Sequence, residues 1–388
     1  MHHQKLPNDL VVEIISHLPL KFAVQCKVVS KNLNISISDP KFCKTLSQNQ
    51  KISTLINSSQ SRLSENLHKI SINSSSIAAS HFETTLPVNL NVLAISKGLI
   101  LLDFYEHMNY CVFNPITGAH QLIPYPDPEQ CYWGAIAPAF AVDYPTSDQY
   151  MLVIIKLIEE GYRFKVFSSI ECGVWREFQL GEENPFLYVT QVNPVYVYDS
   201  IHWLRADDGG GILAFQTKNI EVIFIDLPEM NIDYNAFKCI KWLGVVHGLL
   251  TLVCTLQNSI VISSYDYTSN DWSVSYNVTA NFISGLDYYS YSFPVWIDRE
   301  QVFFLAECPP RHDHDHDHNS ERKRYQITPA LENDDWFGYY PLEFYTFAPT
   351  LASVHAMLSC SVYGKHLSSI IATLDELKRF ITNNSWYS

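Results

Sequence analysis

The feature that most constrains this chain is the return of similar apolar segments, bounded by turns, at intervals of roughly 50 residues. Comparable pairs of apolar runs begin near Lys97, Gln149, Ser200, His247 and Trp296. Within one unit, GLILLDF is followed by YCVFNPITGAHQLIP, so short apolar runs alternate with turns rich in Gly, Pro and Asn. Short strands in a repeat of this length predict the blades of a β-propeller rather than a helical solenoid.

A single blade cannot bury both of its faces, so several blades must close into a ring. We expect about six blades, of which about five lie between residues 88 and 345. The strand expected near Leu342 to Phe347 would complete the sixth with the segment before residue 97. Closure by the two ends of the chain also removes exposed sheet edges.

The N-terminal residues have a helical pattern instead. Apolar residues at three-to-four-residue spacing predict a helix over 7–18, which Pro19 ends. A second helix is expected over 21–29, a third after the capping Ser30, and a fourth after Asp39-Pro40. Four short helices cannot cover all of their apolar residues by themselves. We therefore expect an uncovered apolar stripe that forms an interface.

These patterns predict an α+β multidomain chain, with a small helical domain followed by an all-β propeller. The helical head covers residues 1–47, a Ser/Asn-rich linker and propeller entry covers 48–87, and the propeller covers 88–350. The C-terminal extension, 351–388, contains a possible helix. Its apolar stripe consists of Ile370, Ile371, Leu374, Leu377, Phe380 and Ile381.

Charge is distributed unevenly along the chain. Residues 1–60 carry seven Lys against three acidic residues, whereas the rest carries 19 Lys plus Arg against 37 Asp plus Glu. An acidic body repels phosphate backbones, so we expect no nucleic-acid partner. We also expect no membrane association, because no apolar run reaches spanning length and no secretory leader is evident. Nine cysteines without C-x-x-C spacing favour reduced thiols, and a location in the cytoplasm or nucleus.

Motifs that carry chemistry are few. The sequence lacks G-x-S-x-G, H-E-x-x-H and Walker patterns, so we predict no catalytic residues and no cofactor. The tract RHDHDHDH at 311–318 has metal-binding side chains, but a solvated loop is favoured because a flexible tract does not fix ligand geometry, so we predict no metal site. Asp207 to Gly211 predicts a tight turn rather than a phosphate loop, since a strand follows it.

Two sets of residues resemble a known family. Segments 6–19 (LPNDLVVEIISHLP), 28–33 (VVSKNL) and 37–42 (ISDPKF) closely resemble the F-box motif, over about residues 4 to 47. In the body, KGLI at 97–100, FNPITG at 113–118, IHWL at 201–204 and LGVVHG at 243–248 together resemble the plant F-box-associated, kelch-like propeller domain.

This resemblance implies a substrate-recognition subunit of a Skp-cullin-F-box ubiquitin ligase. The head would bind a Skp-type adaptor, which bridges to a cullin scaffold, and the chain itself would catalyse no reaction. The residues that we expect to contact the adaptor are Leu6, Pro7, Leu10, Ile14, Leu18, Pro19, Val24 and Val28.

The propeller would then bind a protein target that the sequence does not name. Aromatic loops are the candidates, because loops on rigid scaffolds commonly carry recognition, and their residues are Tyr125, Tyr132, Trp133, Tyr288 and Tyr289. Two alternatives stay open: a glycan-binding or hydrolytic propeller, and a scaffold whose degenerate F-box engages no ligase. Leu33, where the family usually has tryptophan, keeps the scaffold alternative open.

Overall fold

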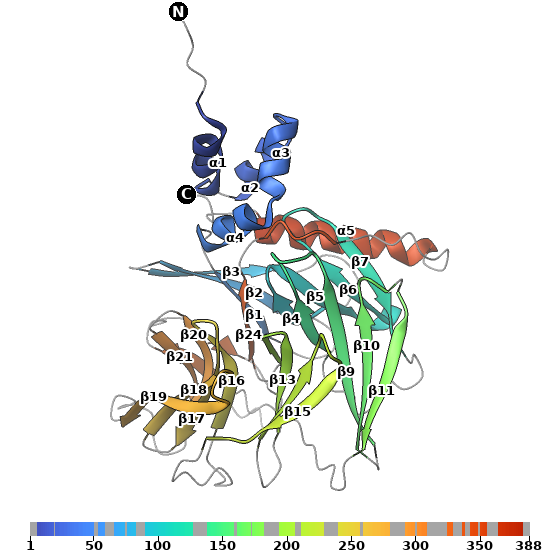
Figure 1. Ribbon diagram of the computed structural model, residues 1–388. Coiled ribbons are helices and arrows are strands. Elements are labelled where there is room, and N and C mark those ends of the chain that lie inside the picture. Colours follow the sequence, from blue (N-terminus) through green and yellow to red (C-terminus); the bar gives the residue numbers. More distant parts are fainter. Residues whose placement is uncertain are drawn as a thin grey trace, which may run out of the picture.

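The chain forms a helical head, a ring of β-sheets and a C-terminal helix that lies across one sheet (Figure 1). The computed structural model describes residues 6–18, 20–49, 53–58, 66–73, 76–82, 90–126, 138–158, 161–171, 173–181, 194–205, 211–228, 240–256, 259–279, 292–298, 301–308, 324–328, 336–337, 342–347, 350–354 and 364–382. All structural statements below refer to these residues.

The head contains the four short helices that the sequence predicts. They are α1 (Asn8–Ser16), α2 (Leu20–Cys26), α3 (Lys31–Ser38) and α4 (Pro40–Asn49). The expected caps are confirmed: the Ser30 hydroxyl accepts a hydrogen bond from the Leu33 amide at 3.1 Å, and Asp39 accepts one from the Lys41 amide at 2.8 Å. The second helix ends earlier than expected, so Val28 and Val29 lie in the turn before α3.

The described strands form six antiparallel sheets of four strands each, which confirms the predicted propeller of about six blades. The first blade contains β24 (Leu342–Phe347), β1 (Ser53–Ser58), β2 (Asn66–Asn73) and β3 (Ser76–Phe82). The second contains β4 (Asn91–Ser96), β5 (Leu99–Phe104), η1 (Tyr105–His107), β6 (Asn109–Phe113) and β7 (His120–Pro124). The third contains β8 (Ala139–Val142), β9 (Tyr150–Ile158), β10 (Gly161–Ser168) and β11 (Trp175–Gly181).

The remaining blades repeat the same order. The fourth contains β12 (Val195–Val197), β13 (Ser200–Arg205), β14 (Gly211–Gln216) and β15 (Glu221–Ile225). The fifth contains β16 (Ile240–Val246), β17 (Leu249–Leu256), β18 (Ser259–Asp266) and β19 (Asp271–Thr279). The sixth contains β20 (Ser292–Asp298), β21 (Gln301–Cys308), β22 (Arg324–Thr328) and β23 (Trp336–Phe337).

The blades close into a ring through their first strands. In order around the ring, β24, β4, β8, β12, β16 and β20 each contact the next, and β20 contacts β24. The first blade joins the two ends of the propeller, because β24 pairs antiparallel with β1 from Ser53↔Phe347 to Ser58↔Leu342. The predicted closing strand is therefore confirmed.

The propeller begins earlier than the sequence suggested. The stretch 48–87, for which we expected a linker and propeller entry, contains β1, β2 and β3. Its Ser- and Asn-rich composition concealed these strands, because the pairing depends on backbone hydrogen bonds that polar residues also make. The strands of the first blade therefore begin at Ser53.

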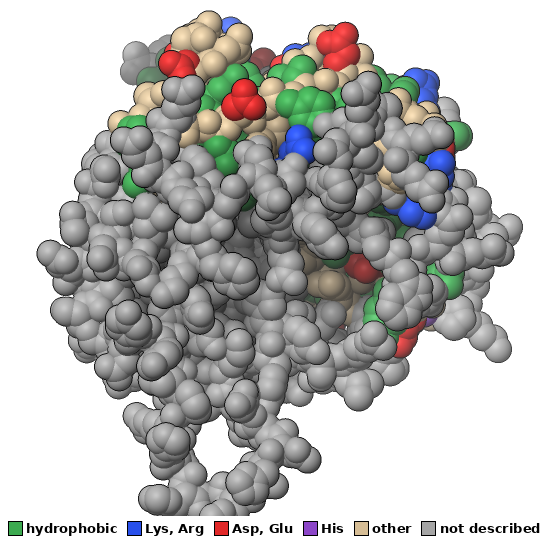
Figure 2. All heavy atoms as spheres, turned by 90° about the horizontal axis from the view of Figure 1, so that it is seen from below, with side chains coloured by type: hydrophobic (Ala, Val, Ile, Leu, Met, Phe, Trp, Pro, Cys, Tyr) green, Lys and Arg blue, Asp and Glu red, His purple; other side chains and the backbone are tan. Residues whose placement is uncertain are grey.

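Most of the apolar core lies between neighbouring blades. On β5, Ile100, Leu102 and Phe104 belong to one buried cluster, while Leu99 and Leu101 belong to another on the opposite face. A strand buried on both faces reads as a continuous apolar run, which explains GLILLDF. Seen from the side opposite the head (Figure 2), the described side chains mix hydrophobic, acidic and basic groups.

The C-terminal helix α5 (Gly364–Thr382) packs on the propeller, as expected from its apolar stripe. Ile370, Leu374, Leu377 and Ile381 are buried in the cluster that also contains Phe104. The Lys378 ammonium donates a hydrogen bond to the Thr117 carbonyl at 3.3 Å. The helix therefore fills one face of the second blade.

A short segment after β24, residues 350–354, links the head to the propeller. Leu351 packs in the core of the head, whereas Ala352 belongs to a cluster of the second and third blades. The fully buried Asn114 side chain holds this segment: its Nδ2 donates to the carbonyls of Thr350 (3.3 Å) and Ala352 (2.7 Å). Its Oδ1 accepts from the amides of Ile116 and Thr117, at 2.9 and 3.3 Å.

Replacing Asn114 by alanine should lower the free energy of unfolding by about 2–4 kcal/mol, because it leaves buried backbone groups without their partners. Guanidinium denaturation measures this change. The matched control is Asn219→Ala, since the Asn219 side chain is exposed and bonds only Gln216 at 3.4 Å; its effect should stay below about 0.5 kcal/mol. Equal effects of the two substitutions would contradict the role assigned to Asn114.

Candidate functional site

The helical head has one apolar core and one apolar surface. Its core joins all four helices to the segment after β24 through Ile15, Leu20, Ala23, Ile37, Phe42, Leu46 and Leu351. These side chains are less than a tenth exposed, so the head is a packed unit and not four independent helices. Packing and capping together stabilise helices that would be marginal alone.

The outward face of α1 is also apolar. Leu6, Leu10 and Ile14 follow one another at four-residue spacing and are 52%, 54% and 56% exposed. Ile15, the next residue after Ile14, is buried. Because residues four apart lie on the same side of a helix, α1 carries one apolar row toward the core and a second toward solvent.

More apolar side chains are exposed where α2 meets α3. Val28 is 88% exposed, Val29 and Ile35 are each 71% exposed, and Phe22 on α2 is 47% exposed. Scattered exposed apolar residues are normal, but α1, α2 and α3 contact one another in this small head. We call Leu6, Leu10, Ile14, Phe22, Val28, Val29 and Ile35 together the exposed apolar face.

The structure distributes the residues predicted to contact an adaptor as follows. Leu6, Pro7, Leu10, Ile14 and Val28 are exposed. Leu18 and Val24 are half-buried against the core of the head, and Pro19 lies outside the described residues.

The sequence reasoning did not single out Phe22, Val29 and Ile35 as interface residues. The adjacent pair Val28-Val29 was an available signal, because neighbouring side chains of a helix point in different directions. Ile35 stands between Leu33 and Ile37, which both face the core, so helical spacing would have placed it on the outward side of α3.

The charges near the exposed apolar face are mainly exposed and weakly coupled. His17 Nε2 lies 3.2 Å from Glu13 Oε1, and both side chains are about two-thirds exposed. Lys31 and Lys41 are also exposed. Exposed ion pairs contribute little free energy. A partner that binds this face would therefore gain mainly from burying its apolar side chains.

Tyr125, one of the residues predicted to bind a target, is engaged within its own blade. Its ring packs against Tyr110 with centroids 4.5 Å apart, and its hydroxyl donates a hydrogen bond to the Asp103 carboxylate. Burial raises the pKa of Asp103 to about 6, an effect that the Tyr125 hydrogen bond partly offsets. Tyr132, Trp133, Tyr288 and Tyr289 lie outside the described residues, and their role stays a prediction.

Asp103 and His202 are buried titratable groups whose side chains are held by hydrogen bonds within the propeller. Asp103 is bonded to Tyr125, as above. His202 is fully buried, and its Nδ1 lies 3.1 Å from the Val195 carbonyl, which can only accept, so Nδ1 donates. Nε2 then accepts a hydrogen bond from the Tyr267 hydroxyl. Both ring nitrogens are occupied, which makes His202 a buried structural residue and not an accessible acid or base.

Among the described side chains, no three His, Cys, Asp or Glu gather closely enough to hold a metal ion. The tract 311–318 lies outside the described residues. None of the helices that the structure describes combines the length and hydrophobicity needed to cross a membrane.

Comparison with known proteins agrees with the geometry of the head. Residues 4–45 match the F-box domain family, so the N-terminal head is an F-box domain. The F-box protein At5g07610 of Arabidopsis thaliana is a distant relative, 22% identical over 303 residues that cover 70% of each chain.

Solved structures resemble this chain only remotely. TolB from Acinetobacter baumannii gives a TM-score of 0.39 at 10% identity and covers 72% of this chain, which in turn spans 61% of TolB. An acylaminoacyl peptidase from Pyrococcus horikoshii gives 0.37 at 10% identity, covering 74% of this chain and 50% of the peptidase. These likenesses are too weak to bear on function, and the propeller follows from the sheet order itself.

Stability should fall between pH 6.5 and pH 4 because of His202. Burial lowers the pKa of His202 from 6.5 to about 4, so within this window the unfolded chain binds a proton that the folded chain does not. The stabilisation is complete above pH 6.5, and about 3 kcal/mol is lost as the pH approaches 4.

Urea denaturation of the wild type and of His202→Asn at several pH values isolates this contribution. The difference in unfolding free energy between the two proteins should shrink as the pH falls. A comparison of variants is needed because Asp103 acts oppositely: its raised pKa makes the protein less stable as the pH rises through about 6. A difference that is independent of pH would rule out the neutral, buried His202.

Proposed function

We propose that this chain is the substrate-recognition subunit of a Skp-cullin-F-box type ubiquitin ligase. The F-box at residues 4–45 would bind a Skp-type adaptor, and the propeller would bind the protein target. The observation that carries the proposal is the exposed apolar face of the head, where Leu10 and Ile14 are more than half exposed.

The exposed apolar face supports an adaptor on physical grounds. Fully burying an exposed Val, Leu, Ile or Phe side chain is worth roughly 1.5–3 kcal/mol, so covering several partly exposed side chains is enough to drive association. The described part of the propeller contacts the head through Leu351 and Ile116 and leaves Leu10 and Ile14 more than half exposed. A second polypeptide is therefore the partner that best fits this surface.

The junction between head and propeller fits a substrate-recognition subunit that catalyses no reaction itself. Cys43 of α4 packs in the same cluster as Tyr144 and Ala352 of the propeller. Two domains joined by a shared core hold a bound target at a defined place relative to the adaptor. The contribution of the chain would be proximity, which raises the effective concentration of target lysines near the ubiquitin-charged enzyme.

We further propose that the protein works in the cytoplasm or nucleus. Cys26, Cys43, Cys111 and Cys254 form no disulfide bond, as suits a reducing compartment. The distant relative is itself named an F-box protein, which supports the proposed class and leaves the target unnamed.

Substituting Leu10→Asp and Ile14→Asp should weaken adaptor binding at least about tenfold each, because a carboxylate would have to be buried in an apolar interface. Binding of the purified full-length chain to a Skp-type adaptor is measured by biolayer interferometry. The matched control is Val274→Asp, which changes a propeller residue of similar exposure, 53%. It should bind like the wild type.

Unchanged adaptor binding by both head variants would sink the proposed role of this face. Circular dichroism and thermal melting of each variant confirm that folding is retained, as expected for residues outside the core of the head.

A further inference from the structure

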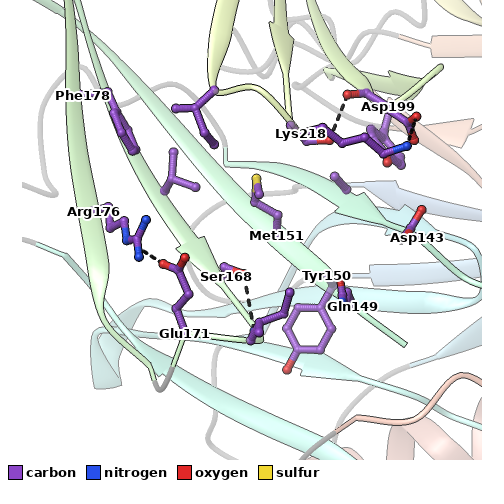
Figure 3. A pocket seen from close by; sticks show the side chains of 16 residues that line it. Asp143, Gln149, Tyr150, Met151, Ser168, Glu171, Arg176, Phe178, Asp199 and Lys218 are labelled. Carbon is purple, nitrogen blue, oxygen red and sulfur yellow. Dashed lines mark hydrogen bonds and ion pairs between the residues drawn. The ribbon is translucent and has the colours of Figure 1, made fainter. Parts of the chain in front are cut away.

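A crevice of about 390 Å³ lies between the third and fourth blades. It is lined by the turns between β8 and β9, β10 and β11, β12 and β13, and β14 and β15, as Figure 3 shows. Tyr144, in the first of these turns, packs with Cys43 of the head. The crevice therefore lies on the side of the propeller that carries the F-box.

The inner wall of the crevice is apolar. Met151 from β9, Val166 from β10, Phe178 from β11 and Ile220 of the fourth blade line it and belong to one apolar cluster; Met151 and Phe178 are labelled in Figure 3. Such a wall suits the methylene stem of a long side chain, which gains from burial even when its tip is charged.

Around this wall, carboxylates outnumber cations. Arg176 Nε lies 2.6 Å from Glu171 Oε2, and Lys218 Nζ lies 2.6 Å from Asp199 Oδ2, so each cation is already paired. The remaining carboxylate, Asp143, accepts a hydrogen bond from the Ser147 hydroxyl at 2.9 Å. The crevice thus holds three carboxylates and two cations, so it carries a net negative charge, although the charge of Asp143 also acts on Lys218.

The same two carboxylates, Asp143 and Asp199, also act on the hydroxyl of Tyr196, which lines the crevice. Burial raises the pKa of its hydroxyl to about 12, and the charges of Asp199 and Asp143 act in the same direction. Carboxylates from two different blades therefore act on one point of the crevice.

Asp199 occupies a position where two other blades use glycine. The turns Lys97-Gly98, His247-Gly248 and Tyr198-Asp199 each join the first two strands of a blade, and all six residues have positive φ. Glycine adopts such φ angles without cost, whereas an aspartate there costs backbone energy. Of these three turns, the one in the fourth blade places a carboxylate, that of Asp199, beside the crevice.

Exposed apolar residues lie on one side of the crevice. Ile170, which lines it, is 60% exposed, and Val174 in the same turn between β10 and β11 is 62% exposed. Exposed apolar side chains beside a charged crevice suit a polypeptide partner, which can cover them with its neighbouring residues.

We propose that this crevice holds an arginine or lysine side chain of an extended segment of the target protein. The apolar wall would contact the methylene stem, and Asp143, with Asp199 beside it, would bind the cationic tip. This inference rests on the proposed function, because it identifies what the propeller recognises. It also agrees with the acidic excess of residues 61–388, which hold 37 acidic against 19 basic residues.

The test uses the full-length chain and arrays of short peptides with one fixed position occupied by arginine, lysine, citrulline or glutamate. The wild type should bind the arginine and lysine sets about tenfold more strongly than the citrulline and glutamate sets. The double variant Asp143→Asn, Asp199→Asn should lose this preference, since the amides keep the size of the side chains but remove both charges. Asparagine also tolerates the backbone of position 199.

The matched control is Glu177→Gln, which removes a carboxylate of the third blade that pairs with Arg163 and Lys165 and does not line the crevice. It should retain the basic preference. No preference in the wild type, or a preference that survives in the double variant, would overturn the inference.

Adaptor binding is measured on the same preparations to separate the two proposals. A chain that binds the adaptor but shows no basic preference contradicts the crevice alone. A chain that prefers basic peptides but does not bind the adaptor supports the crevice and contradicts the ligase role.

Discussion

The pairing of β24 with β1 is the interaction on which the rest of the structure depends. The second to fifth blades bury apolar side chains against one another, and blades of this kind are stable only as a closed ring. Closure requires strands from the two ends of the propeller to meet, and β24 meets β1 over residues 53–58 and 342–347. Without this pairing, β1 and β24 would each present an unpaired sheet edge, and the ring would stay open.

Ring closure also places the head. The chain leaves β24 at residue 347 and continues into the segment 350–354, which Asn114 holds by two hydrogen bonds. That segment contributes Leu351 to the core of the F-box. The same backbone that completes the ring therefore fixes the F-box to one side of it, and the exposed apolar face of the head stays open to solvent.

The molecule has an apolar surface on the head and a charged crevice on the side of the propeller that carries the head. The exposed apolar face of the head offers hydrophobic burial, which gives affinity without strong dependence on salt. The crevice between the third and fourth blades offers charge, with Asp143 and Asp199 beside an apolar wall, and charge favours specificity. One surface that binds by hydrophobic burial and one that binds by charge suit a subunit that holds two partners at once.

Local chemistry in the sequence determined the kinds of element and their order. Capping by Ser30 and Asp39, the apolar spacing of α1 and the recurrence of strand pairs depend only on nearby residues, and all were predictable. The strands hidden in residues 48–87 were not, because polar strands are recognised only by the partner to which their backbone bonds.

The tertiary structure alone decided which apolar residues stay exposed and which charges meet. Leu10 and Ile15 look equivalent in the sequence, and only packing against α4 and Leu351 separates them. Likewise, Asp143 and Asp199 come together because two blades stack side by side. The reason is physical: short-range preferences set the element, whereas contacts between distant residues exist only after the ring has closed.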